Sequence, residues 1–502
     1  MSSRKDCMMK MNKTICALLW LAMTAGAAWA QNDPQQTPGD AQQAPGDTQQ
    51  TPDDSQRTPP PAAFGPENAP VIVNENPPIS GLDQPSLEPN FQPRSMLVGG
   101  VEGSESLDSN IGSDARPAWH SVTRGLGGLT MQRLWRRYQL AAAYVGGVGY
   151  YNRAGDGLKQ IQKVQAQQSI LWRTGQLTMR DSFSYLPEGS FGSGAFGGSG
   201  GFHLGLGSLG EGMGMLGGGL GGHYGALGAQ QFGSLGQAPR ISNTGIVDVV
   251  QGLSPRSSLT AAGAYGLTHF TDNSQGFINS EQAGAQAGYS YTVSKKDQLA
   301  LSYGFQSFHF PGEAGADNVI AHVVQGMYGH RVSGRMDLVF GAGPQWTRTQ
   351  DPVTGTISRI SVAGQATLRY QFHNTSTMLS FERYDNSGSG FFAGAQSNVA
   401  RLELEHKLGR RYTAHAALGF AHNRRLQSST QGVAATSYNY GFAGLALRRE
   451  FGYNWGTYLS YQWNDQIFDT CPVAGQQFCN RISVRHVLTF GVDWHFRPIR
   501  ID

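Results

Sequence analysis

The sequence predicts an all-β fold: a transmembrane antiparallel up-and-down β-barrel of 16–18 strands, preceded by a disordered N-terminal tail. Three observations support this prediction. Apolar and polar residues alternate in long runs between positions 95 and 496. The breaks between the runs alternate between tight and long, and residues 1–30 have the features of an export signal. Short turns on one side of a membrane and longer loops on the other are typical of such barrels.

The composition agrees with a barrel wall. Charged residues make up 15% of the chain and hydrophobic residues only 39%, with 68 glycines. Soluble domains average about 25% charged residues. A wall of alternating strands reconciles few charges with modest hydrophobicity, because only every second residue must contact lipid. The net charge of +3 gives no reason to expect a nucleic-acid partner.

The first 30 residues predict a secretory signal peptide. A basic start precedes an apolar stretch at residues 15–23, and an Ala-Trp-Ala cleavage site ends at residue 30. An uncleaved anchor is the alternative, but the apolar stretch is shorter than the roughly 18 residues of a membrane helix. Cys16 lies inside this stretch and no cysteine follows it near the cleavage site, so a lipoprotein anchor is not expected.

Residues 31–94 predict a disordered periplasmic tail. Residues 31–54 hold a degenerate seven-residue repeat rich in Pro, Gln and Asp, with almost no apolar side chains. Such a composition buries too little surface to offset chain entropy. The tail is interpreted as a tether, or equally as a segment without a selected function.

The barrel is expected to occupy residues 95–502. The predicted strands cover residues 95–104, 120–134, 138–150, 161–173, 176–185, 241–251, 257–270, 280–293, 298–310, 319–332, 336–348, 357–372, 377–384, 398–408, 412–423, 437–449, 453–468 and 482–496. This count is eighteen, or sixteen if the first two strands are periplasmic decoration. Both numbers are even, as in bacterial single-chain barrels.

The two faces of each strand can be assigned from the alternation. In the strand at 357–372, Ile360 and Leu368 share one side and Arg369 the other. An arginine facing lipid at mid-depth costs about 2–4 kcal/mol, so the polar side should face the lumen. The soluble alternative, a β-sandwich with its apolar side inward, rarely sustains so many long meandering strands. The predicted pore-lining residues are Gln365, Arg369, Gln371, Arg401, Glu403, Glu405, Arg485 and Asp493.

Aromatic residues near the strand ends indicate where the membrane boundaries lie. Tyr289, Tyr291, Trp494 and Phe496 are examples of the expected interfacial girdle. By loop parity, the N-terminal tail and the tight turns are expected in the periplasm, and the long loops outside the cell.

Residues 189–236 form a Gly-rich insertion with scattered Phe, Leu and Met side chains. Its matches to the dinucleotide fingerprint and the nucleophile-elbow pattern lack the required strand–helix context, so both are attributed to chance. Two interpretations remain open. The insertion is a flexible extracellular loop, or it folds into the lumen, which would keep its apolar side chains out of water and narrow the pore.

The mature chain keeps two cysteines, Cys471 and Cys479, which flank a long loop. An exported protein passes through an oxidising compartment, so a disulfide between them is predicted. Two cysteines without a histidine cluster make a poor zinc site.

The sequence offers no catalytic, cofactor-binding or metal-binding constellation. Glu403 and Glu405 are two residues apart and lie beside Arg401. We interpret them as lumen charges that are balanced by neighbouring basic residues, in preference to a catalytic pair of carboxylates. The histidines show no metal-ligand spacing. We therefore expect neither an enzyme nor a cofactor.

The opening strand, SMLVGGVEG at residues 95–103, leads into DSN at 108–110. This pattern resembles the start of outer-membrane β-barrel porin-like families, some of which accompany exopolysaccharide-export clusters. The Gly-rich insertion and the Pro/Gln tail have no counterpart in the resemblance. What it implies is a porin-like barrel, tied in some members to polymer export, and it brings no catalytic residues.

Together these observations predict a porin-like channel for small hydrophilic solutes in the outer membrane of a diderm bacterium. Barrels of sixteen to eighteen strands leave an aqueous channel unless something fills it. The alternative is a structural or accessory barrel for exopolysaccharide export or surface attachment. An autotransporter is disfavoured because residues 31–94 are too short for a folded passenger. The expected partners are the lipid bilayer and either a small solute or a polysaccharide; the solute and the oligomeric state stay open.

Overall fold

The computed structural model describes residues 95–111, 118–153, 157–187, 239–272, 277–311, 318–333, 335–351, 355–386, 388, 390, 392–426, 435–452, 454–469, 481–497 and 499–501. The predicted signal peptide, the Pro/Gln tail, the Gly-rich insertion and the Cys471–Cys479 pair lie outside these residues. Within the described ranges, no helix is long and apolar enough to cross a bilayer.

The described residues form eighteen long strands and one two-residue strand. They are β1 (Met96–Asp108), β2 (His120–Leu134), β3 (Tyr138–Tyr151), β4 (Gly157–Trp172), β5 (Gly175–Leu186), β6 (Arg240–Ser254), β7 (Ser257–Phe270), β8 (Ser280–Thr292), β9 (Asp297–His309), β10 (Asn318–Ser333), β11 (Met336–Asp351), β12 (Gly355–Phe372), β13 (Thr375–Asn386), β14 (Ala395–Leu408), β15 (Tyr412–Arg425), β16 (Ser437–Phe451), β17 (Trp455–Phe468), β18 (Ile482–His495) and β19 (Ile499–Arg500). The count of eighteen is confirmed, and the sixteen-strand alternative is wrong because β1 and β2 belong to the wall.

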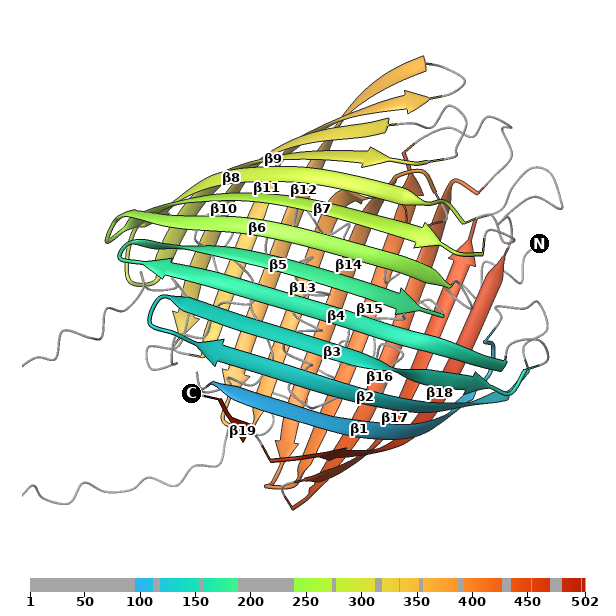
Figure 1. Cartoon of the computed structure of the whole chain (residues 1–502). Coiled ribbons are helices and arrows are strands. Elements are labelled where there is room, and N and C mark those ends of the chain that lie inside the picture. The colour runs from blue at the N-terminus through green and yellow to red at the C-terminus, as the bar shows by residue number, and fades with distance from the viewer. Residues whose placement is uncertain are drawn as a thin grey trace, which may run out of the picture. The chain divides into compact units, whose positions relative to one another are not determined.

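The strands form one closed antiparallel barrel (Figure 1). Each strand pairs with its neighbours along the chain, and β1 closes the wall by pairing with β18 from Gly100↔His495 to Asp108↔Val487. The short β19 extends this closure by pairing with Met96 and Leu97. Closure joins the two edges that an open sheet would expose, and this is what allows a β-sheet to sit in lipid.

The outer surface of the barrel is apolar, as the alternation predicts. On β12, Ile360 is 79% exposed and Val362 is 56% exposed, whereas Gln365, at an odd position and on the opposite face, is 5% exposed. The same contrast holds on β8 between the exposed Tyr289 and the buried Gln286. A surface of this composition is stable against lipid tails and not against water.

Three of the tight turns are shaped by a serine at the end of the preceding strand or two residues beyond it. The hydroxyls of Ser254, Ser294 and Ser333 accept hydrogen bonds from the backbone N–H two residues on, at 3.2, 3.0 and 3.3 Å. Serine supports this local turn geometry because its hydroxyl satisfies a backbone donor that would otherwise face water. The sequence therefore fixes where the chain reverses at this end of the barrel, called the tight-turn rim; the opposite end is called the long-loop rim.

At the long-loop rim, the tip of the β13–β14 hairpin bends into the barrel. The β12–β13 ladder ends at Gly364↔Arg383, although β12 continues to Gly355. Beyond that point, the described residues from 392 to 397 are all buried, so both faces of the hairpin are covered. Asp385 lies on the face of β13 that is lipid-facing lower down, yet its carboxylate accepts a hydrogen bond from Thr347 on the inner face of β11.

Candidate functional site in the barrel lumen

The inward face of the wall is divided into sectors of different charge. Strands β7, β8 and β9 present only uncharged residues inward, among them the buried Gln282, Gln286 and Gln306. On β2–β6 the charged inward residues are mostly basic, and the single acidic one among the described residues, Asp248, lies 3.7 Å from Arg180. The wall from β12 through β18 to β1 carries both signs. Its described charged residues include Arg369, Arg401, Glu403, Glu405, Arg448, Arg485, Asp493, Glu102 and Asp108.

The closure between β18 and β1 is bridged on the lumen side by an ion pair. Arg485 donates from Nε to both carboxylate oxygens of Asp108, at 2.9 and 2.8 Å, and its Nη2 also bonds the carboxylate. Both side chains are almost fully buried. Planar two-point contact of this kind holds a guanidinium and a carboxylate in one geometry. The pair therefore ties together the first and last long strands of the chain.

Hydroxyl groups extend the polar contacts between β18 and β1 to the next strand, β2. Ser106 on β1 and Thr489 on β18 lie 2.9 Å apart through their hydroxyl oxygens. Arg124 on β2 donates to Ser106, also at 2.9 Å. The polar contacts across the closure thus involve three strands, and the buried hydroxyls of Ser106 and Thr489 both have a partner.

A second ion pair passes over β17. Arg448 on β16 donates two hydrogen bonds to Asp493 on β18, at 2.8 and 3.0 Å. The strand between them presents Gly456, where a Cβ would lie 2.5 Å from Nη2 of Arg448 and 2.6 Å from Oδ1 of Asp493. The glycine is therefore needed to leave space for a contact between second-neighbour strands.

A similar arrangement lies beside it. Tyr458 on β17 lies over Gly491 on β18, and its hydroxyl donates to Glu102 on β1 at 2.5 Å. A Cβ at Gly491 would be 2.3 Å from the Tyr458 ring. Two inward glycines thus allow long polar side chains to lie flat along the wall instead of projecting into the lumen.

Near the tight-turn rim, Asp337 on β11 is held between two arginines. Arg369 on β12 bonds it directly, with its Nε at 3.2 Å, and Arg331 on β10 lies 3.6 Å away. These side chains are only partly buried. The carboxylate compensates one of the two cations, which leaves this part of the wall net positive.

The structure puts the predicted pore-lining residues on the inward face, with very different exposure. Gln365, Glu403, Arg485 and Asp493 are buried, with exposures of 5, 8, 2 and 1%. Arg369, Arg401 and Glu405 are intermediate, and Gln371 is exposed at the tight-turn rim. Arg369, Arg485 and Asp493 each join an ion pair, with Asp337, Asp108 and Arg448 respectively.

Those three partners, and Glu102 and Tyr458, are absent from the predicted pore-lining residues. The alternation could have found them, because Asp108 and Glu102 share the inward face of β1 and Arg448 that of β16. What the alternation does not give is the pairing, which depends on how far one strand is shifted against the next.

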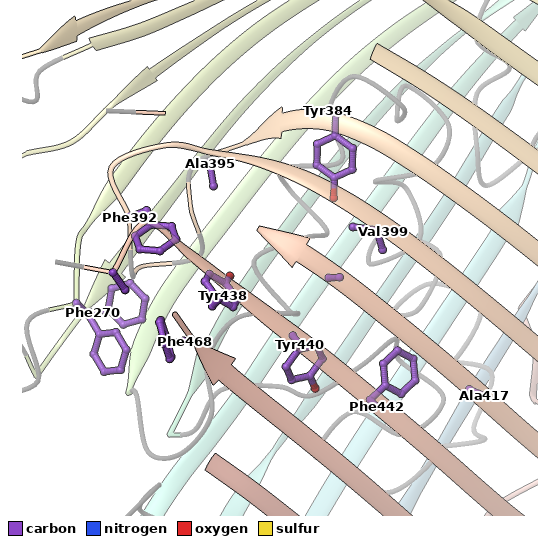
Figure 2. Packing of buried hydrophobic residues seen from close by; sticks show 13 residues of the cluster. Phe270, Tyr384, Phe392, Ala395, Val399, Ala417, Tyr438, Tyr440, Phe442 and Phe468 are labelled. Atoms are coloured by element: carbon purple, nitrogen blue, oxygen red, sulfur yellow. The ribbon is translucent and has the colours of Figure 1, made fainter. Parts of the chain in front are cut away.

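An aromatic cluster narrows the long-loop rim from inside. Here the mouth cluster means Phe270, Phe277, Phe392, Tyr438 and Phe468, which are all buried and come from strands or loops far apart in the chain. Ring centroids lie 4.9 Å apart for Phe270–Phe277, 5.5 Å for Phe392–Tyr438 and 5.1 Å for Tyr438–Phe468. Figure 2 shows the rings of Phe392, Tyr438 and Phe468 gathered beside Phe270. Inward-facing aromatics in this number were not predicted from the alternation.

The β13–β14 tip makes this cluster possible. The N–H of Ile278, in the loop after β7, donates to the carbonyl of Gly390 at 2.8 Å. Gly390 has a φ of 82°, which favours glycine. A Cβ there would lie 2.6 Å from the ring of Phe270. The hairpin tip therefore spans from β13–β14 to β7–β8, six strands away around the wall.

Among the described residues, no group of three or more His, Cys, Asp or Glu side chains could hold a metal ion. In the contacts described above, polar side chains of the lumen pair with one another. These contacts hold neighbouring strands together and determine the charge of the inner surface.

Comparisons with solved structures find similar proteins in bacterial outer membranes. The chain is similar to Pseudomonas aeruginosa OccK2 (OpdF), with 9% identity and a TM-score of 0.41 over 81% of this chain and 98% of that one. It is also similar to the FrpB iron transporter from Neisseria meningitidis, with 7% identity and a TM-score of 0.35 over 80% of this chain and 82% of that one. A bacterial polysaccharide outer membrane secretin has 10% identity and a TM-score of 0.33 over 80% of this chain and 99% of that one. No protein-family model and no curated protein matches the chain. At these identities and TM-scores the likenesses assign neither a family nor a role to this chain.

Proposed function

We propose that the barrel is a porin-like channel that passes small hydrophilic solutes through its lumen. The observation that carries this proposal is the polar inward face of a closed wall whose outer face is apolar. A closed barrel of eighteen strands encloses space for an aqueous path. The separate basic, uncharged and mixed sectors would orient a dipolar solute during passage.

The narrowest part of this path is proposed to be the long-loop rim. The mouth cluster and the β13–β14 tip place buried aromatic rings and backbone across the interior there. Small solutes would pass beside the tip, and larger ones would be excluded.

Single-channel conductance in planar bilayers tests the channel and its constriction together. Folded protein should give discrete conductance steps, and Phe392→Ala should increase the step size because it removes a ring from the mouth cluster. The matched control is Phe381→Ala, since Phe381 is 45% exposed on the outer face of neighbouring β13. Absence of steps from folded protein would contradict the channel, and equal steps in all three proteins would contradict the constriction.

A second candidate is favoured by the burial of the inward side chains. Gln325, Gln345 and Asn464 face inward, yet their exposures are 1, 1 and 0%. A structural or accessory barrel for exopolysaccharide export or surface attachment would need no open path. The same recordings separate the two candidates, because a barrel of this kind gives no steps in wild-type protein.

We also propose the orientation expected from loop parity. The N-terminal tail and the tight-turn rim would lie in the periplasm, and the long-loop rim would face the outside of a diderm cell. β1 supports this proposal because it begins at the tight-turn rim, next to the tail.

A further inference from the structure

The tight-turn rim has a one-sided charge. Eight turns lie at this rim, between β2 and β3, β4 and β5, and so on to β16 and β17. Their residues include no Asp or Glu. The basic residues in these turns, called the turn cations, are Arg136, Arg137, Arg173, Arg256, Lys295, Lys296, Arg335, Arg410 and Arg411.

The turn cations are exposed, and in the described part of the chain no salt bridge joins any of them to a carboxylate. Their backbone positions are nevertheless fixed. The carbonyls of Arg256, Arg335 and Arg411 accept hydrogen bonds from strand residues at 2.7, 2.8 and 2.9 Å. The charges therefore sit at defined points of the rim without a salt bridge to a described carboxylate.

Cations at this rim also stack on the lipid-facing aromatic residues. Arg335 lies 5.0 Å from the ring of Phe372, and Arg449 lies 4.4 Å from that of Phe451 and 5.2 Å from that of Tyr412. Arg133 lies 5.0 Å from the ring of Trp135. These rings are exposed on the outer surface at the strand ends, where interfacial aromatics reach the headgroup level of a bilayer. Stacking holds each guanidinium at that level with its edge N–H groups free to donate.

We propose that the tight-turn rim binds the phosphate headgroups of anionic phospholipids in the leaflet around it. Basic residues near an anionic membrane surface add to one another in attraction, and guanidinium groups match phosphate oxygens in geometry. The cations recur around the barrel and several lie on lipid-facing rings, which suits an annulus of lipid better than a soluble acidic protein at one point. The proposal requires the barrel to be in a bilayer and does not depend on passage through the lumen.

Spin-labelled lipids provide the test. Full-length folded protein is placed in phosphatidylcholine vesicles that contain a trace of spin-labelled phosphatidylglycerol or spin-labelled phosphatidylcholine, and the motionally restricted fraction is measured by electron paramagnetic resonance. We expect a several-fold preference for phosphatidylglycerol, which decreases at high salt. Arg335→Gln/Arg449→Gln should measurably lower this preference, whereas Arg348→Gln/Arg424→Gln, which removes two exposed cations at the long-loop rim, should keep it.

A second variant keeps the test valid if the stacked arginines are needed for assembly. Arg173→Gln/Arg256→Gln removes two turn cations that have no ring contact in the described structure, and it should also lower the preference. Heat-modifiable migration on a gel confirms that each protein is folded. The proposal is overturned if wild-type protein binds both lipids equally, if both tight-turn variants keep the wild-type preference, or if the long-loop variant loses as much as they do.

Discussion

At the scale of single residues, Asp181 on β5 departs from the pattern of the outer wall. Its carboxylate faces outward and is exposed, and its nearest partner is Asn243 on β6, whose Nδ2 lies 3.3 and 3.4 Å from the two oxygens. Asp181 is six residues beyond Gly175, where β5 begins. At about 3.3 Å per residue and a tilt of roughly 40°, it lies about 15 Å from the tight-turn rim, near mid-depth of the membrane.

Asp181→Leu should therefore stabilise the barrel. It replaces a lipid-exposed carboxylate by an apolar side chain, and we expect a gain of about 1–2 kcal/mol in the free energy of unfolding. Reversible urea unfolding in phosphatidylcholine vesicles measures it. The control is Asp337→Leu, which removes a lumen carboxylate bonded to Arg369 and should destabilise. A loss of stability in Asp181→Leu would indicate that this face contacts protein instead of lipid.

At the scale of strands, an inward glycine allows side chains of the two strands on either side of it to contact each other. Gly456→Val should displace the Arg448–Asp493 ion pair, because the new Cβ would lie within 2.6 Å of both side chains. We expect a loss of about 2–4 kcal/mol, since two buried charges lose their partner. Gly326→Val is the matched control, because a Cβ there meets nothing within 4 Å. Equal unfolding free energies for the two variants would show that the ion pair does not contribute.

The β13–β14 hairpin shows one place where the strand prediction is inaccurate and why. The sequence predicts strands at 377–384 and 398–408, whereas β13 continues to Asn386 and β14 begins at Ala395. The missing residues lie in the tip that bends inward, where both faces are buried and the alternation disappears. Contacts with residues of other strands give this tip its environment: Thr347 donates to Asp385, and Gly390 lies against Phe270 and Ile278, over 100 residues earlier in the chain.

At the scale of the whole molecule, the orientation in the membrane can be checked directly. An epitope inserted at residues 352–354, between β11 and β12, should be labelled by antibody on intact cells. The same epitope at residues 409–411, between β14 and β15, should be labelled only after permeabilisation. The reverse pattern would invert the proposed orientation and would move the turn cations to the other leaflet.

Much of the lumen could be predicted because an up-and-down barrel is a local fold. Gln365, Arg369, Arg401 and Asp493 were assigned to the inward face from alternation alone, since a period of two fixes the face of every residue once one is known. Their partners could not be assigned. Whether Arg485 meets Asp108, or Asp493 meets Arg448, depends on the shift between neighbouring strands and on glycines that leave room between them.

By itself, the sequence determined the order of the strands and which side of each faces lipid, because each strand pairs with the next along the chain. It left the number of strands at sixteen or eighteen, and the pairing of β1 with β2 in the structure decided for eighteen. Only the tertiary structure decided which residues meet inside the barrel. The closure of β18 on β1, the inward bend of the β13–β14 tip and the mouth cluster join residues far apart in the chain. Their positions follow from the curvature and stagger of the closed wall, which no local pattern of side chains records.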